Sequence, residues 1–233
     1  ALLYTIPSFQ NPGGQSMSEE RRQRLVQLSR KHDFIIAADE VYQMLWYDNR
    51  PPPALGTLIE QGNVLSLGSF SKILAPGARL GWIQASEPLI ERLLDSGVIN
   101  SGGCFNQFTS LVVREAIKSG LQAAFVQQLR ETYARRVEVM DEALQAHFGK
   151  VARWEKPRGG YFFWLVFDEG IDTTALRAAA DQFRTGFQPG QNSSSRDALR
   201  NCLRLSFAHY DEGTIREGIE RLARLFAERS RLS

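Results

Sequence analysis

The chain has 233 residues, of which 43% are hydrophobic, and a formal net charge of +2. This apolar content suffices for a packed core and excludes a disordered chain as the default expectation. Acidic and basic residues are interspersed, so there is no basic stripe of the kind that nucleic-acid binding needs, and no apolar run is long enough to span a bilayer. We expect a globular, cytoplasmic protein that binds neither nucleic acid nor membrane.

The sequence does not indicate a metal site. Its two cysteines, Cys104 and Cys202, stand in no Cys-x-x-Cys spacing, and its three histidines do not cluster with cysteines or carboxylates. We expect both thiols to be reduced and buried, and no metal to be bound.

The first predicted elements are a strand, a turn and a helix. Residues 4–7 have the composition of a short strand and break into the turn 10–14, Gln-Asn-Pro-Gly-Gly, which carries Asn11. Ser16 and Glu19 then form a capping-box pattern, which predicts the start of a helix with leucines and a valine on one side.

Two buried strands end in residues that can carry chemistry. The apolar run 34–38 leads into Asp39 and Tyr42, and the run 64–67 leads into Gly-Ser-Phe-Ser-Lys, which ends at Lys72. Open α/β sheets bind their ligands outside the carboxyl ends of their strands. This predicts that Lys72 lies at a ligand site.

The polar groups around this lysine indicate a bound anion. Ser69, Ser71 and Arg79 supply donors suited to a phosphate. A lysine beside a phosphate site indicates pyridoxal phosphate held as a Schiff base, whereas taken alone the segment fits a surface lysine equally well. Ser69 to Lys72 also satisfies the Ser-x-x-Lys nucleophile motif of β-lactamases, but the partner triplets which that motif requires do not follow in the right order.

Alternating strands and helices continue up to a long polar helix. A strand at 80–83, a helix at 88–94 and a helix at 105–118 favour a mostly parallel sheet with helices on its faces. The helix at 122–147 is interpreted as a connector, although an ordinary surface helix explains it nearly as well. We expect a large domain over residues 1–120, the connecting helix over 121–150 and a small α+β domain over 151–233.

The last third of the chain predicts antiparallel strands and helices. Its expected elements are strands at 151–154, 159–165 and 203–207, a helix at 174–183 and a polar loop at 191–196. Arg204 lies inside the last strand. The final helix has one apolar face, formed by Ile215, Ile219, Leu222 and Phe226.

Four of these motifs occur in a characteristic order: Asn-Pro-x-Gly, Asp-x-x-Tyr, Ser-x-Ser-Lys with a later arginine, and Arg-Leu-Ser-Phe. In this order they closely resemble the fold-type I pyridoxal-phosphate aminotransferases of class I/II, in the branch with aminoadipate and kynurenine aminotransferases. The resemblance implies an α/β, aspartate-aminotransferase-like fold, comprising the C-terminal part of a large, mostly parallel-sheet domain and a smaller α+β C-terminal domain. It also implies a homodimer acting on amino acids and 2-oxo acids.

The resemblance assigns a role to each candidate residue. Lys72 carries pyridoxal 5'-phosphate and moves the proton, Asp39 keeps the pyridine nitrogen protonated, and Arg204 binds the substrate α-carboxylate. The remaining residues contact other parts of the cofactor: Asn11 and Tyr42 its phenolic oxygen, with Asn11 also near the substrate, and Ser69, Ser71 and Arg79 its phosphate. Gly13 stands where the family usually has threonine, and an interlobe salt bridge is the alternative role for Arg204.

Two further functions are compatible with these motifs. One is the pyridoxal-phosphate-sensing domain of a GntR-type transcription regulator, and the other is a different pyridoxal-phosphate reaction on the same fold, such as C–S lysis or decarboxylation. The family's glycine-containing phosphate loop and ring-stacking aromatic are missing from their expected place before Asn11. We therefore expect this stretch to belong to a longer protein and to be inactive alone.

Overall fold

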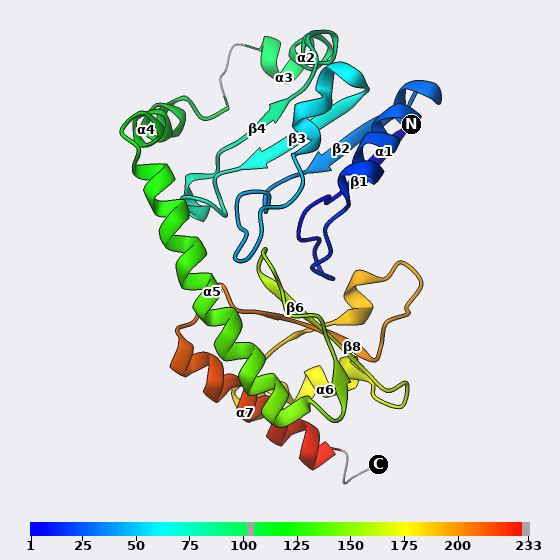
Figure 1. Cartoon of the computed structure of the whole chain (residues 1–233), viewed down its shortest axis with the longest axis vertical. Coiled ribbons are helices and arrows are strands. Elements are labelled where there is room, and N and C mark those ends of the chain that lie inside the picture. The colour runs from blue at the N-terminus through cyan, green and yellow to red at the C-terminus, as the bar shows by residue number, and fades with distance from the viewer. Residues whose placement is uncertain (102–104, 230–233) are drawn as a thin grey trace. The chain divides into compact units, whose positions relative to one another are not determined.

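The computed structural model describes residues 1–101 and 105–229 (Figure 1). Cys104 lies outside this part. The chain divides into two compact units. The first comprises Ala1–Gln10 and Gln15–Arg130, and the second comprises Asn11–Gly14 and the chain from Glu131 onward.

The first unit is built on a four-stranded mixed sheet. Its strand order follows the sequence, with three parallel strands and an antiparallel fourth: β1 (Leu2–Thr5), β2 (Ile35–Asp39), β3 (Val64–Ser69) and β4 (Gly81–Gln84). The expectation of a mostly parallel sheet is confirmed. Because β2 and β3 run in the same direction, their carboxyl ends, Asp39 and Ser69, lie at the same edge.

Helices follow the strands throughout this unit. They are α1 (Glu19–Lys31), the 3-10 helices η1 (Leu55–Gln61) and η2 (Pro76–Ala78), α2 (Glu87–Leu94), α3 (Gly97–Asn100), α4 (Gln107–Lys118) and α5 (Leu121–Phe148), which continues into the second unit. The predicted start of α1 was wrong. Ser18, not Ser16, is the N-cap, and its hydroxyl accepts a hydrogen bond from the Arg21 amide.

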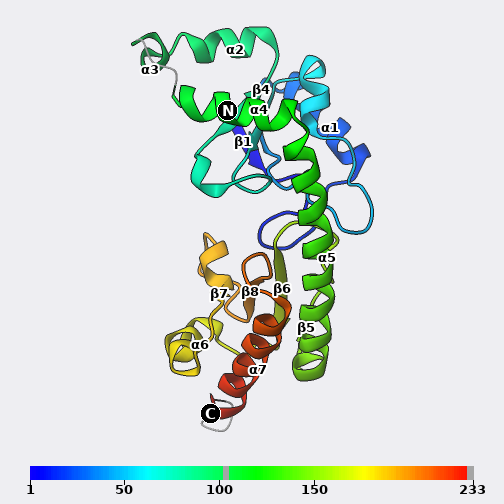
Figure 2. The same cartoon turned by 90° about the vertical axis from the view of Figure 1, so that its left-hand side faces the viewer.

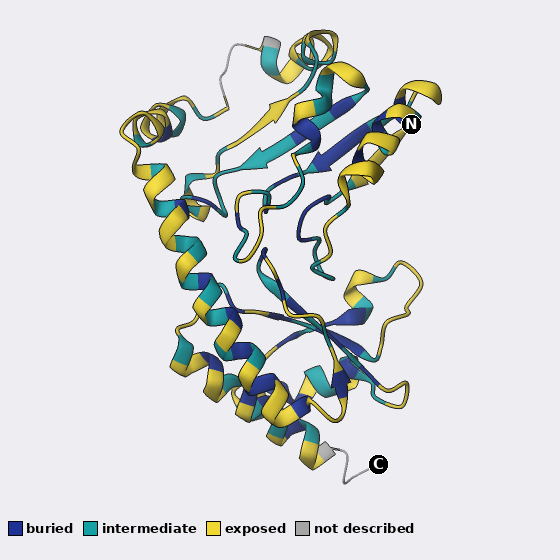
Figure 3. Cartoon of the chain, in the orientation of Figure 1, coloured by how far each residue is buried: buried dark blue, intermediate teal, exposed yellow. Residues whose placement is uncertain are grey.

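One face of the sheet carries the hydrophobic core of this unit. Val26 of α1 and Leu55 of η1 pack with Ile36, Ala38 and Val64 of the central strands. Successive side chains of a strand point to opposite faces. Asp39 therefore points to the opposite face. All four residues of β4, at the edge of the sheet, are exposed (Figure 3).

The second unit contains an antiparallel sheet with helices packed against it. The strand order is β5-β6-β8-β7, and the strands are β5 (Ala152–Arg153), β6 (Phe162–Phe167), β7 (Gln188–Pro189) and β8 (Cys202–Ser206). The helices are α6 (Thr173–Ala180), η3 (Asp181–Phe183), η4 (Gly190–Ser193) and α7 (Glu212–Arg229). Part of the expected polar loop at 191–196 is thus a short 3-10 helix.

The predicted apolar face of the last helix is confirmed. Ile215, Ile219 and Leu222 of α7 are buried. The C-terminal half of α5 and α7 lie side by side in both views (Figures 1 and 2), with the rings of Phe148 and Phe226 5.3 Å apart. Cys202 is buried as expected, and this burial raises the pKa of its thiol.

Candidate active site

Asp39 ends β2 with one carboxylate oxygen bonded and the other not. Its Oδ2 accepts a 2.6 Å hydrogen bond from the Tyr4 hydroxyl of β1. Its Oδ1 is buried and has no hydrogen-bond partner among the residues that the structure describes. A buried carboxylate oxygen without a donor is costly and marks a place where a donor is missing. Tyr4 was not among the residues that the sequence singled out.

Lys72 lies in a tight turn directly after β3. The Phe70 carbonyl accepts the amides of Ile73, Leu74 and Ala75, which winds the segment around the lysine. The Ser69 hydroxyl accepts the amide of Ser71 at 3.1 Å. The lysine side chain is half-buried. Ser69, Ser71 and Lys72 thus share one compact turn, as their spacing predicted.

Arg79 has an unusual backbone conformation near this turn. Its φ is +49°, in the left-handed region that residues other than glycine seldom adopt. The Asn106 side chain donates to the carbonyls of Ala78 and Arg79, at 3.0 and 3.2 Å, and supports this conformation. The exposed guanidinium of Arg79 donates to the Pro76 carbonyl. Strained backbone of this kind often marks functional positions.

Glu40 and Tyr42 follow Asp39 in the sequence, and their side chains lie in different surroundings. The Tyr42 side chain is buried in the turn after β2. Glu40 faces the hydrophobic core, where its carboxylate accepts the amides of Leu55 and Gly56 and the hydroxyl of Ser66. Because successive residues of a strand point to opposite faces, Glu40 points away from Asp39.

In the second unit, Arg204 and Asn11 meet although they are far apart in the sequence. Nη1 of Arg204 donates a 2.6 Å hydrogen bond to Oδ1 of Asn11. The guanidinium carbon of Arg204 lies 4.1 Å from the ring centre of Phe162, a residue of the adjacent strand β6. This is a cation–π contact. The Asn11–Pro12 peptide bond is cis. The sequence analysis did not single out Phe162, because there it is one of several apolar residues in a predicted strand.

The structure therefore groups the candidate residues within each unit. In the first unit, Asp39 and Ser69 form the carboxyl ends of β2 and β3, and these ends are followed by Tyr42, Ser71, Lys72 and Arg79. In the second unit, Asn11 and Arg204 are hydrogen-bonded.

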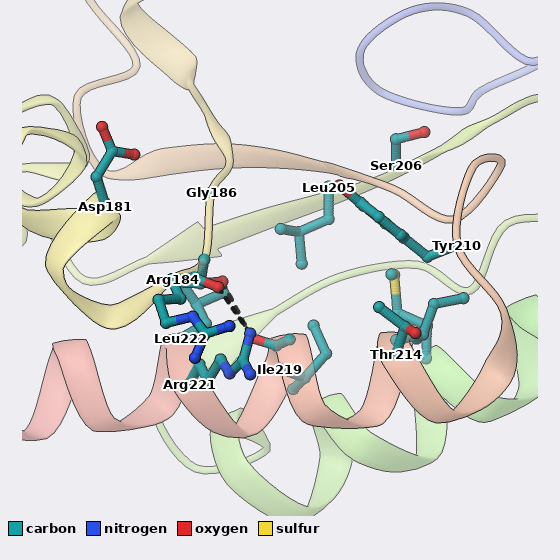
Figure 4. A pocket seen from close by; sticks show the side chains of 14 residues that line it. Asp181, Arg184, Gly186, Leu205, Ser206, Tyr210, Thr214, Ile219, Arg221 and Leu222 are labelled. Carbon is teal, nitrogen blue, oxygen red and sulfur yellow. Dashed lines mark hydrogen bonds between the residues drawn. The ribbon is translucent and has the colours of Figure 1, made fainter.

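A separate pocket lies in the second unit, between β8 and α7 (Figure 4). Its volume is about 490 Å³. Leu205, Ile219 and Leu222 form apolar walls, and Arg221 donates to the Arg184 carbonyl at 3.1 Å. None of the candidate site residues lines this pocket.

Over residues 1–101 and 105–229 no group of three or more histidine, cysteine or acidic side chains is arranged to hold a metal ion. Among the same residues, no helix has the length and apolar character needed to cross a membrane.

Comparison with known proteins identifies the class. The model of the family "Aminotransferase class I and II" matches residues 4–222. The α-aminoadipate aminotransferase LysN of Thermus thermophilus, solved in complex with N-(5'-phosphopyridoxyl)-L-leucine, superimposes with a TM-score of 0.91 at 29% identity, over 100% of this chain and 60% of that one. The fold is thus the fold-type I aminotransferase fold.

Curated relatives of this chain include an aminotransferase and a transcriptional regulator. Aromatic-amino-acid aminotransferase 1 of Thermococcus litoralis is 38% identical over 97% of this chain and 54% of its own length. The uncharacterized HTH-type transcriptional regulator YisV of Bacillus subtilis is 33% identical over 95% of this chain and 45% of its own length. The chain belongs to the class I and II aminotransferase family, and it spans about half the length of these relatives.

Proposed function

We propose that the protein is a pyridoxal-phosphate-dependent aminotransferase that moves an amino group between an amino acid and a 2-oxo acid. The observation that carries the proposal is the buried Oδ1 of Asp39, which has no partner among the described residues. A protonated pyridine nitrogen is the donor that would satisfy it. The carboxylate would in turn favour the charged form of the ring.

The other groups of the first unit fit the same cofactor. A primary amine on Lys72 suits a covalent bond to an aldehyde, and the hydroxyls of Ser69 and Ser71 with the guanidinium of Arg79 suit a phosphate. Tyr42 and Asn11 are donors for the phenolic oxygen. When bound, pyridoxal phosphate supplies an electron sink for the bonds at the substrate α-carbon.

Arg204 is the proposed receptor for the substrate α-carboxylate. Its guanidinium lies against the ring of Phe162 and donates to the amide oxygen of Asn11, and both contacts orient it. A fixed, planar guanidinium binds a carboxylate with two parallel hydrogen bonds, and both the amino acid and the 2-oxo acid carry that carboxylate. With the cofactor bound, the Lys72 amine would be the group placed to hold and move the proton at the substrate α-carbon as a general base.

The organisation of the whole protein is part of the proposal. We infer a large domain over residues 1–120, a connecting helix over 121–150 and a small domain over 151–233, in a cytoplasmic homodimer. Coupled transamination tests the function: the full protein, given pyridoxal phosphate, an amino-acid panel and 2-oxoglutarate, should form glutamate. Failure to form glutamate with any aromatic or acidic donor would contradict the proposal.

A second candidate function is the sensing domain of a transcription regulator. Its support is the 33% identity to the regulator YisV, which is close to the identity shared with the enzymes. Sequencing the full gene and measuring DNA binding by the full protein separates the two. Specific DNA binding without glutamate formation would favour the regulator.

A further inference from the structure

Arg22 is a buried arginine of α1 whose guanidinium donates hydrogen bonds to loop residues. Only 1% of its surface is exposed. Its Nη2 donates to the Pro7 carbonyl at 2.8 Å and to the Ser8 hydroxyl at 2.7 Å. Its Nε donates to the Met17 carbonyl at 3.0 Å, and its Nη1 donates to the Pro53 carbonyl at 2.9 Å.

Three of these four acceptors lie at the ends of the segment that carries Asn11, which we call the Asn11 loop (Pro7–Met17). They are the carbonyls of Pro7 and Met17 and the hydroxyl of Ser8. Pro7 and Ser8 form its first end and Met17 its last, so one guanidinium holds both. The planar, three-nitrogen group of arginine is required for donation in these separate directions, which a lysine ammonium cannot reproduce from one atom.

Further hydrogen bonds close the base of the Asn11 loop. The Met17 amide donates to the Pro7 carbonyl at 2.8 Å, and the Gln10 amide donates to the Gln15 carbonyl at 2.9 Å. The Phe9 amide donates to the Ser16 hydroxyl at 3.0 Å. Beyond the pair of Gln10 and Gln15, only residues 11–14 remain at the tip.

The charge of Arg22 has its own buried counterpart. Oε1 of Glu40 lies 4.0 Å from Nη1 of Arg22, and both side chains are buried. Desolvation lowers the pKa of Arg22, while the Glu40 charge opposes this shift. Because the Glu40 carboxylate is already satisfied by two amides and the Ser66 hydroxyl, it fixes the guanidinium in place without removing its donors from the loop.

We propose that Arg22 is a positioning residue that acts on the substrate site through Asn11. It fixes the base of the Asn11 loop, the loop fixes the amide of Asn11, and that amide orients the Arg204 guanidinium for the substrate carboxylate. The inference rests on the proposed function of Arg204. Without Arg22 the loop ends are released, Asn11 loses its fixed position, and substrate binding weakens more than turnover.

A double-mutant cycle with Arg22→Lys and Asn11→Ala in the full, cofactor-loaded protein tests this proposal. Each single variant should raise KM for the amino acid and for the 2-oxo acid by about 10-fold, with a smaller change in kcat, since one charge-assisted hydrogen bond is being removed. The double variant should match Asn11→Ala alone, because two residues that act through one contact are not additive. Arg24→Lys, at an exposed position of α1, is the matched control.

A second readout does not depend on activity. In cofactor-free protein, Arg22→Lys should increase the hydrogen exchange of the amides of Gln10 and Met17, and leave β3 unchanged. Ser8→Ala, a milder loss of one acceptor, should act in the same direction if Arg22→Lys does not fold. Multiplicative KM effects in the double variant, or unchanged exchange in the loop, would overturn the proposal. If the wild-type protein does not transaminate, the proposed function fails, and the exchange experiment still decides whether Arg22 positions the loop.

Discussion

The Tyr4 hydroxyl donates a 2.6 Å hydrogen bond to Oδ2 of Asp39, and Oδ1 of the same carboxylate is buried without a partner among the described residues. The neighbouring strand thus engages one carboxylate oxygen and leaves the other without a donor. Desolvation and then this hydrogen bond raise the pKa of Tyr4 from 10.0 to about 12. Both effects favour the protonated phenol, which is the form that can donate.

This raised pKa predicts a pH dependence of stability. Below pH 10 Tyr4 is protonated in the folded and unfolded states. Between pH 10.0 and about 12 the unfolded chain loses the proton while the folded chain keeps it, so the free energy of unfolding should fall as the pH rises. Urea unfolding of the wild type and of Tyr4→Phe across this window measures the effect. The variant should show a shallower decline, and identical slopes would contradict the Tyr4–Asp39 contact.

Asp39→Asn removes the charge of this side chain and keeps its shape. The amide can still accept from Tyr4 but cannot stabilise a protonated ring nitrogen, so kcat should fall on the order of 10²-fold while cofactor is retained. Absorbance of bound cofactor and steady-state kinetics provide the two measurements. Asp48→Asn, at an exposed position, serves as the control. Near-wild-type turnover by Asp39→Asn would show that Asp39 has only a structural role.

Gly68, which precedes the Lys72 turn, should not tolerate a side chain. A Cβ built on Gly68 would lie 2.0 Å from the indole of Trp82, and that ring is also packed against Phe70 at 4.8 Å. Gly68→Ala should therefore destabilise the fold by about 1–3 kcal/mol through overpacking. Gly77→Ala is the matched control, because a Cβ there would meet nothing within 4 Å. Chemical denaturation compares them, and equal stabilities would contradict the tight packing.

The candidate residues at the ends of β2 and β3 could be predicted because each follows an apolar run whose length and bounding turn are local signals. The helix start at Ser16 was mispredicted because that hydroxyl is engaged by the Phe9 amide, within the Asn11 loop.

Other parts of the site depend on contacts between distant segments. The pairing of Asn11 with Arg204 spans 193 residues, and only the folded chain shows it. Arg22 looks like an ordinary charged residue of a surface helix, since arginine is seldom fully buried. Its spacing from the buried Val26 and Ser29, four and seven residues later, was the one local signal that it faces inward.

Arg204→Lys should weaken both half-reactions together. Donor and acceptor acids present the same α-carboxylate, and lysine cannot make the two parallel hydrogen bonds of a guanidinium or its planar contact with Phe162. The kcat/KM for each substrate should fall about 10- to 100-fold, as expected for loss of one charge-assisted hydrogen bond. Arg200→Lys, an exposed partner of Asp172, is the control. Loss for only one of the two acids would indicate recognition of the substrate side chain instead.

The covalent bond that we propose between Lys72 and the cofactor can be tested by chemical trapping. The full protein is loaded with pyridoxal phosphate, reduced with borohydride, digested and mapped by mass spectrometry, with Lys72→Ala treated in parallel. The account predicts a phosphopyridoxyl group on the peptide that contains Lys72, and no label at that peptide in the variant. A stoichiometric label on another lysine, retained in Lys72→Ala, would contradict it.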